Sequence, residues 1–304
     1  MNITHPLISK QARIITPALN WAVRLCLDRV AMRRSAVMFR GQSRVGKSRC
    51  AVFVAEQLKK QFPECHVAFY IALKRKTRHP NNLCRELCYT ENIHPKERVD
   101  LRYHLVAHVE SLLVGQQAGQ YLLVIDEVQR LLPVDYFDLA DLYNLLQAKS
   151  ICMTLIAFAQ PDIDAQITMI KATREQQLTA RFLTEVLTFP GCRGVDELGV
   201  ILNAYDTGSE FPSGSGTSYT AHFIPKAFSA GFRLARVTEP LWLELSSSTS
   251  GPYMNNIPME HLCESILNLL LSLAAKDSTS MELDPRWVSE AVQKSNLRAF
   301  CDAL

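Results

Sequence analysis

The segment Gly41–Ser48 reads GQSRVGKS and fits the pattern GxxxxGK[ST]. Its glycines allow a turn in which successive backbone N–H groups point inward and, with the start of the next helix, cradle an anion. An apolar strand candidate, Ala36–Arg40, precedes the segment, and a helical pattern, Lys47–Gln61, follows it. This context predicts a phosphate-binding loop in which the ammonium group of Lys47 reaches the β- and γ-phosphates and the hydroxyl of Ser48 binds Mg²⁺. We expect the whole loop to bind the nucleotide: Gly41, Gln42, Ser43, Arg44, Val45, Gly46, Lys47 and Ser48.

A second motif, Tyr121–Glu127 (YLLVIDE), is an apolar run that ends in two carboxylates. Taken alone, it is equally typical of a strand followed by a solvated acidic turn. About 80 residues after the phosphate loop, at the end of a third strand candidate, it predicts the other half of a nucleotide site. We expect Asp126 to hold Mg²⁺ and Glu127 to act as the general base that polarises the attacking water. Together the two motifs predict binding of Mg²⁺ and ATP, and favour hydrolysis over binding alone.

Short apolar runs alternate with helical patterns through the first two thirds of the chain. Such alternation predicts a parallel sheet covered by helices on both faces. The strand candidates are Ala36–Arg40, His66–Leu73, Tyr121–Ile125, Cys152–Ala159 and Phe182–Phe189. The helix candidates between them are Lys47–Gln61, Asn82–Leu87, Lys96–Val114, Tyr136–Gln147 and Arg174–Arg181.

From about Val195 the strand pattern stops, and the helical patterns Val195–Tyr205, Ile257–Ala275 and Pro285–Ser295 remain. We therefore expect an N-terminal helical segment (1–30), an α/β nucleotide-binding core (31–194) and a small helical lid with Ser/Gly-rich loops (195–304). The segment Ser218–Ala235 reads either as a lid helix or as an element that docks a partner protein.

Composition excludes several classes of protein. The chain has 304 residues, of which 48% are apolar and 21% charged, so wholesale disorder is excluded. The longest apolar stretch, near Ile266–Ala275, is about half the length of a membrane span. The N-terminus lacks a signal-peptide layout, and the cysteine count is odd, so we expect a cytoplasmic protein with reduced thiols and no membrane partner.

Positive charge is concentrated near the N-terminus. Residues 1–80 contain 16 Lys and Arg against 3 Asp and Glu, whereas residues 81–304 contain 17 against 27. This asymmetry fits a polyanionic partner, a solvated basic face, or docking on the acidic part of another copy. The densest cluster follows the second strand candidate and predicts contact with the DNA backbone, without reading of sequence, because no aromatic residue lies within it. Its residues are Lys74, Arg75, Lys76, Thr77 and Arg78.

Two further positions complete the predicted site. Gln160 follows the fourth strand candidate, where a polar side chain can contact the γ-phosphate or orient the attacking water. Arg181, in LTARF just before the fifth strand candidate, can reach the ATP of a neighbouring subunit as an arginine finger. Arg174 and Arg193 compete with Arg181 for that role.

These motifs together resemble the AAA+ ATPases over about residues 20–190. Within that group the layout looks most like the bacterial transposition regulators TnsC and TniB. The features are VIDEVQRL, AFAQPDI, the basic loop KRKTRHPNNL and LTARF, of which the first two are typical of AAA+ proteins in general. In one respect the chain departs from the family: the helix candidate Ile257–Ala275 contains no Lys or Arg, so we assign no lid arginine.

The resemblance implies a homo-oligomeric ring or helical filament around double-stranded DNA in the bacterial cytoplasm. Such an assembly recruits a transposase to a target chosen by a separate target-selection protein, and ATP hydrolysis resets or dismantles it. Two alternatives stay open. One is another AAA+ remodeller, such as a helicase loader or a secretion-associated ATPase. The other is an ATP-gated interaction module that scarcely hydrolyses ATP.

Overall fold

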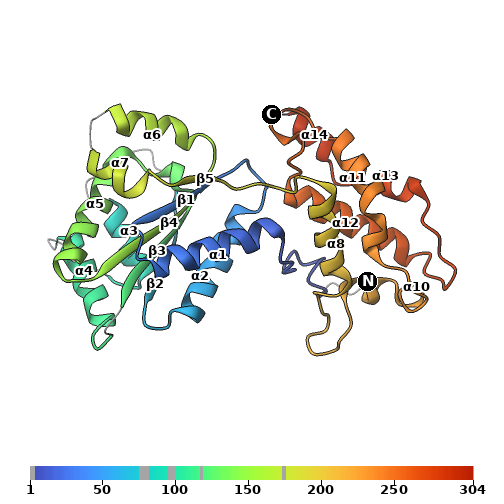
Figure 1. Cartoon of the computed structure of the whole chain (residues 1–304), viewed down its shortest axis with the longest axis horizontal. Coiled ribbons are helices and arrows are strands. Elements are labelled where there is room, and N and C mark those ends of the chain that lie inside the picture. The colour runs from blue at the N-terminus through green and yellow to red at the C-terminus, as the bar shows by residue number, and fades with distance from the viewer. Residues whose placement is uncertain (1–3, 75–81, 95–99, 117–118, 173–175, 304) are drawn as a thin grey trace. The chain divides into compact units, whose positions relative to one another are not determined.

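The computed structural model describes residues 4–74, 82–94, 100–116, 119–172 and 176–303. These residues form two compact units, which are coloured by position along the chain in Figure 1. We call residues 21–41 and 47–189 the α/β unit. We call residues 1–20, 42–46 and 190–304 the helical unit. The basic residues Arg75, Lys76, Thr77 and Arg78 lie outside the described residues.

The α/β unit is built on a five-stranded sheet in the order β2-β3-β4-β1-β5, and every pairing between neighbours is parallel. The order places β1, which precedes the phosphate loop, beside β4 and one strand away from β3. This is the predicted α/β P-loop core with a five-stranded parallel sheet, so the expected fold class is confirmed. The strands are β1 (Ala36–Arg40), β2 (His66–Ile71), β3 (Gln120–Asp126), β4 (Cys152–Ala159) and β5 (Val186–Thr188).

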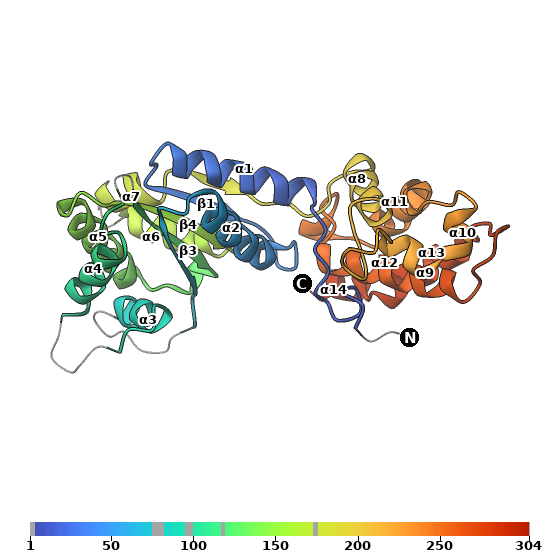
Figure 2. The ribbon, with the colours of Figure 1, turned by 90° about the horizontal axis from the view of Figure 1, so that it is seen from below.

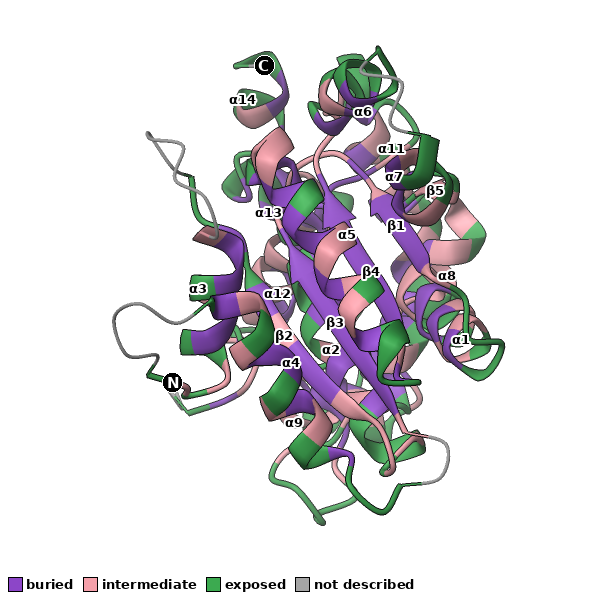
Figure 3. Cartoon of the chain, turned by 90° about the vertical axis from the view of Figure 1, so that its left-hand side faces the viewer, coloured by how far each residue is buried: buried purple, intermediate pink, exposed green. Residues whose placement is uncertain are grey.

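The central strands are buried on both faces, as Figure 3 shows, because helices cover the sheet from both sides. All residues of β3 are buried, which explains why Tyr121–Ile125 within it is a continuous apolar run rather than an alternation. α2 packs on one face, and α3, α4 and α5 cover the other. The α-helices from the start of the chain through β5 are α1 (Pro17–Ala31), α2 (Lys47–Gln61), α3 (Asn82–Thr90), α4 (Leu101–Leu112), α5 (Pro133–Ala148), α6 (Ile163–Ala172) and α7 (Gln176–Phe182).

The last strand is shorter than predicted. We expected a strand over Phe182–Phe189, but β5 covers only Val186–Thr188 and pairs with β1. Phe182 instead ends α7 and is buried in the core, and the main-chain N–H of Leu183 still donates to the carbonyl of Thr179. The apolar residues at the start of this run are therefore buried as part of a helix. Over so short a run, the spacing of apolar residues does not distinguish a helix from a strand.

The helical unit contains α8, α11, α12 and α13, which pack around an apolar core and are seen from a second side in Figure 2. The segment Ser218–Ala235 forms α9, α10 and the start of η2, and contributes buried residues to this core. No helix in the described ranges is long and apolar enough to cross a bilayer. The helices are α8 (Val195–Asp206), α9 (Tyr219–Phe223), α10 (Pro225–Ser229), η2 (Leu234–Val237), α11 (Thr238–Ser247), η3 (Gly251–Tyr253), α12 (Met259–Ala274), α13 (Pro285–Lys294) and α14 (Leu297–Asp302).

Candidate nucleotide-binding site

The phosphate loop begins at Gly41, directly after β1, where the backbone is tightly enclosed. The N–H of Gly41 donates to the carbonyl of Ala159 at 3.1 Å, and a Cβ at Gly41 would lie 2.3 Å from the carbonyl oxygen of Phe189. No side chain fits at that distance, because the obstructing atom belongs to the backbone. The local packing of β1, β4 and the end of β5 therefore requires glycine at this position.

Lys47 begins α2 and is buried, with 5% of its surface exposed. Its ammonium group donates to the carbonyl oxygen of Gly41 at 2.7 Å. Burial lowers the pKa of Lys47, whereas the nearby carboxylates of Glu127, Asp126 and Asp162 act to raise it. The loop thus holds a desolvated ammonium group whose charged form is stabilised by three carboxylates. Such a group is suited to bind a phosphate.

Asp126 is the last residue of β3 and is also buried. Burial raises the pKa of its carboxyl group, although hydrogen bonds from the Ser48 hydroxyl and the Glu127 N–H act to lower it. Mg²⁺ prefers oxygen ligands such as hydroxyl and carboxylate oxygens, and it is commonly coordinated by one or two carboxylates together with the substrate's phosphates. Ser48 and Asp126 therefore fit a magnesium ion. In the described part of the chain, no cluster of three His, Cys, Asp or Glu residues suits a metal.

Glu127 follows β3 with its backbone in the left-handed region, at φ 59° and ψ 36°, just before the short helix η1 (Val128–Arg130). A non-glycine residue there is uncommon, and such strain concentrates at functional sites. The side-chain amide of Gln160, at the end of β4, donates to Oε2 of Glu127 at 3.3 Å. The structure thus brings together two residues that the sequence placed 33 positions apart.

A sequence model of the AAA domain family matches residues 30–167. Over these residues, which are less than half of the chain, the sequence is similar to the AAA domain family. Among solved structures, a chain of the Drosophila origin recognition complex (ORC) bound to DNA is 11% identical over 92% of this chain and 67% of its own, with a TM-score of 0.58. This likeness concerns the fold, and it agrees with an α/β P-loop core.

Two further solved structures match this chain at lower scores. Domain III of the Thermotoga maritima replication initiation protein DnaA is 13% identical over 93% of this chain and 94% of its own, with a TM-score of 0.48. Cdc6p from Pyrobaculum aerophilum is 14% identical over 93% of this chain and 80% of its own, with a TM-score of 0.47. No curated protein matches the chain.

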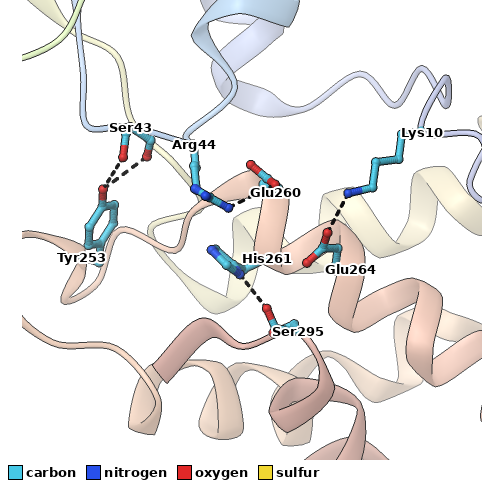
Figure 4. A network of polar contacts seen from close by, with 8 residues as sticks. All are labelled: Lys10, Ser43, Arg44, Tyr253, Glu260, His261, Glu264 and Ser295. Carbon is cyan, nitrogen blue, oxygen red and sulfur yellow. Dashed lines mark hydrogen bonds and ion pairs between the residues drawn. The ribbon is translucent and has the colours of Figure 1, made fainter. Parts of the chain in front are cut away.

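Residues 42–46, the middle of the phosphate loop, belong to the helical unit and make contacts within it. Tyr253, at the end of η3, donates from Oη to the carbonyl oxygen of Ser43 at 3.3 Å, and its Oη lies 3.0 Å from the Ser43 Oγ (Figure 4). Because the tyrosine has one proton, the Ser43 hydroxyl supplies the proton for the second bond. Tyr253 is 1% exposed, so both bonds are shielded from water.

Arg44 makes a second set of contacts, with α12 and α14. Its guanidinium lies 3.1 Å from a carboxylate oxygen of Glu260 (Figure 4). It also lies 4.7 Å from the centre of the Phe300 ring. Its carbonyl accepts a hydrogen bond from the N–H of Glu260 at 3.2 Å. Arg44 has φ 61° and Gly46 has φ 104°, both in the left-handed region. These contacts hold a loop conformation that an arginine seldom adopts.

The remaining loop residues and the other predicted site residues differ in their surroundings. Val45 is buried and Gln42 is half-buried. Arg181, in the last turn of α7, donates to the side-chain oxygen of Asn144 at 2.7 Å and stacks over the Tyr143 ring, so both partners lie on α5. Lys74 is exposed just after β2.

Sequence reasoning assigned no role to Gln129, Tyr253 or Glu260. Gln129 lies in the stretch VIDEVQRL, two positions after Glu127. A polar residue so close to the candidate general base was the feature that could have indicated a role for it. Tyr253 contacts Ser43 from 210 positions away, and Glu260 contacts Arg44 from 216 positions away. A single sequence carries no signal for such contacts, because they depend on how distant segments pack.

We predict that Tyr253→Phe weakens ATP affinity by up to about 30-fold, since it removes two hydrogen bonds to the phosphate loop and keeps the buried ring. Each such bond contributes about 1 kcal/mol. Fluorescence titration with a labelled ATP analogue measures the change. Tyr219→Phe is the matched control, because Tyr219 is a buried tyrosine of the same unit that contacts the rings of His5 and Tyr205. Equal effects of the two variants would show that Tyr253 has no specific influence on the loop.

Proposed function

We propose that this protein is an ATP-dependent, DNA-associated AAA+ ATPase that regulates transposition. In this proposal it assembles on duplex DNA as a ring or helical filament when ATP is bound. It then links a target-selection protein to a transposase, and hydrolysis resets or dismantles the assembly. The observation that carries the ATPase part is the grouping of Lys47, Ser48, Asp126, Glu127 and Gln160 at the carboxyl ends of β1, β3 and β4.

Each of these side chains has chemistry suited to one part of the reaction. The Lys47 ammonium binds the β- and γ-phosphates, and the oxygens of Ser48 and Asp126 hold Mg²⁺. When bound, Mg²⁺ neutralises charge on the β- and γ-phosphate oxygens. Glu127 accepts a proton from the attacking water, and the Gln160 amide orients that water or contacts the γ-phosphate. Arg181 serves the site of a neighbouring subunit, which couples hydrolysis to assembly.

The DNA and transposition parts of the proposal rest on different support. The 16 Lys and Arg against 3 Asp and Glu in residues 1–80 favour a polyanionic partner. The AAA+ fold is shared with a Drosophila ORC chain whose structure was solved on DNA. The layout in which the basic loop is followed by VIDEVQRL, AFAQPDI and LTARF favours a transposition regulator of the TnsC and TniB type over other AAA+ remodellers.

The decisive experiment measures binding to random-sequence duplex DNA without nucleotide and with a slowly hydrolysed ATP analogue. We expect rings or filaments on DNA, seen by electron microscopy, only with the analogue. The double variant Lys74→Ala and Lys76→Ala should weaken binding about equally on all sequences. It should also reduce the slope of log affinity against log salt by about one for each lost phosphate contact.

Lys59→Ala with Lys60→Ala is the matched control, because it removes two exposed lysines from the last turn of α2. If the control pair weakens binding as much as the loop pair, the basic loop is not a specific DNA surface. If neither nucleotide state binds DNA, the DNA part of the proposal is wrong. ATP-dependent capture of a protein partner would then favour a protein remodeller.

A further inference from the structure

Gln129, in the middle of η1, connects the candidate general base to the end of β4. Its side-chain nitrogen donates to Oε2 of Glu127 at 2.8 Å. Its side-chain oxygen accepts from the main-chain N–H of Gln160 at 3.1 Å. Gln129 is 7% exposed, so neither bond competes freely with water.

The network determines which way the Gln129 amide faces. The N–H of Gln160 is a donor only, so the atom of Gln129 that faces it must be the amide oxygen. The amide nitrogen then faces Glu127, whose ionised carboxylate is an acceptor only. A third contact anchors the main chain, because the side-chain nitrogen of Gln166 donates to the carbonyl oxygen of Gln129. Gln129 therefore presents a fixed donor to Glu127.

The donors to Glu127 converge on one of its two carboxylate oxygens. Gln129, Arg130 and Gln160 lie 2.8, 3.1 and 3.3 Å from Oε2. Oε1 has no hydrogen bond in the part of the chain that the structure describes. The side chain of Arg130 is 40% exposed, whereas Gln129 is buried and makes the shortest contact. The arrangement orients the carboxylate and leaves Oε1 as the oxygen that can accept a proton.

We propose that Gln129 is a positioning residue for hydrolysis, which acts by holding Oε2 of Glu127 so that Oε1 faces the attacking water. This inference rests on the proposed ATPase function. It assigns Gln129 a role through Glu127 and not through contact with the nucleotide. Because a displacement of about 1 Å at a reacting group can cost about 100-fold in rate, loss of this bond should reduce turnover and leave nucleotide affinity unchanged.

Two substitutions separate donation to Glu127 from simple structural support. Gln129→Met fills a similar volume without polar atoms. Gln129→Glu keeps the shape and the acceptor for the N–H of Gln160, but it replaces the donor with a second carboxylate next to Glu127. If donation to Glu127 matters, turnover falls in the order wild type, Gln129→Met, Gln129→Glu. If Gln129 only ties down the end of β4, Gln129→Glu is the better tolerated of the two.

The experiment measures kcat, KM, ATP affinity and melting temperature of the full-length protein, with and without duplex DNA. We expect kcat to fall about 10-fold for Gln129→Met and about 100-fold for Gln129→Glu, with ATP affinity within about 2-fold of wild type. Gln147→Met is the matched control, since it removes an exposed amide from the last turn of α5. We expect its kcat to stay near the wild-type value.

Three results would overturn the role of Gln129. These are wild-type turnover in Gln129→Glu, a loss of ATP affinity or melting temperature that parallels the loss of kcat, and an equal loss of kcat in the control Gln147→Met. If the wild-type protein binds ATP but shows no turnover with or without DNA, the proposed ATPase function itself is refuted, and the role of Gln129 with it.

Discussion

Replacing Lys47 with alanine is expected to lower ATP affinity by about 100-fold or more. A hydrogen bond to a charged group contributes up to about 3 kcal/mol, and about 1.4 kcal/mol corresponds to a factor of ten. The surroundings of Lys47 add to the loss. Its ammonium group lies near Asp126, Glu127 and Asp162, so its removal leaves more negative charge to repel an incoming triphosphate. Isothermal titration calorimetry with ATP measures the effect.

Lys59→Ala is the control, because it removes an exposed lysine from the last turn of the same helix. Circular dichroism establishes that both variants are folded, which matters because Lys47 also donates to the Gly41 carbonyl. Normal ATP affinity in folded Lys47→Ala would contradict the assignment of Gly41–Ser48 as the phosphate loop.

Glu127→Gln is expected to reduce ATP turnover by about 100- to 10,000-fold while ATP binding is retained. General base catalysis typically contributes that factor, and a neutral amide cannot accept the proton of the attacking water. The amide has nearly the shape of the carboxylate, and its oxygen still accepts from Gln129. Phosphate release under saturating ATP measures turnover, and calorimetry measures binding.

Glu56→Gln, a neutralised carboxylate on α2, controls for the general loss of one negative charge. If Glu127→Gln keeps wild-type turnover, Glu127 is not the general base. If the wild-type protein binds ATP with equally low turnover, an ATP-gated interaction module becomes the better interpretation. ATP-dependent DNA assembly that persists longer in Glu127→Gln than in wild type would support hydrolysis as the step that dismantles the complex.

Much of the α/β unit was predictable because its strands are short apolar runs between helical patterns. The bounds of β1, β4 and α2 agree with the prediction residue for residue. A parallel strand buried on both faces has no polar alternation, so its ends coincide with the ends of the apolar run. The prediction was wrong at Phe182, where the apolar residues that follow Arg181 end a helix before the short β5 begins. A run of that length fits both structures until the packing of its side chains is known.

The candidate site divides in a similar way. The glycines, lysine and serine of a phosphate loop are close together in the sequence and bind phosphate with neighbouring backbone groups. The position of the loop could therefore be predicted from Gly41–Ser48 alone. The roles assigned to Lys47, Asp126, Glu127 and Gln160 remain predictions for the experiments above. The contacts of Ser43 and Arg44 were not predictable, because their partners Tyr253 and Glu260 lie more than 200 positions away.

The sequence by itself determined the order of strands and helices, the position of the phosphate loop and the pair of carboxylates after β3. These features depend on residue type and spacing over a few positions, which one chain records directly. Only the tertiary structure decided that Gln129 faces both Glu127 and Gln160, and that Tyr253 holds the phosphate loop. Those contacts depend on the direction of side chains and the pairing of distant segments, and both are set by packing of the whole unit.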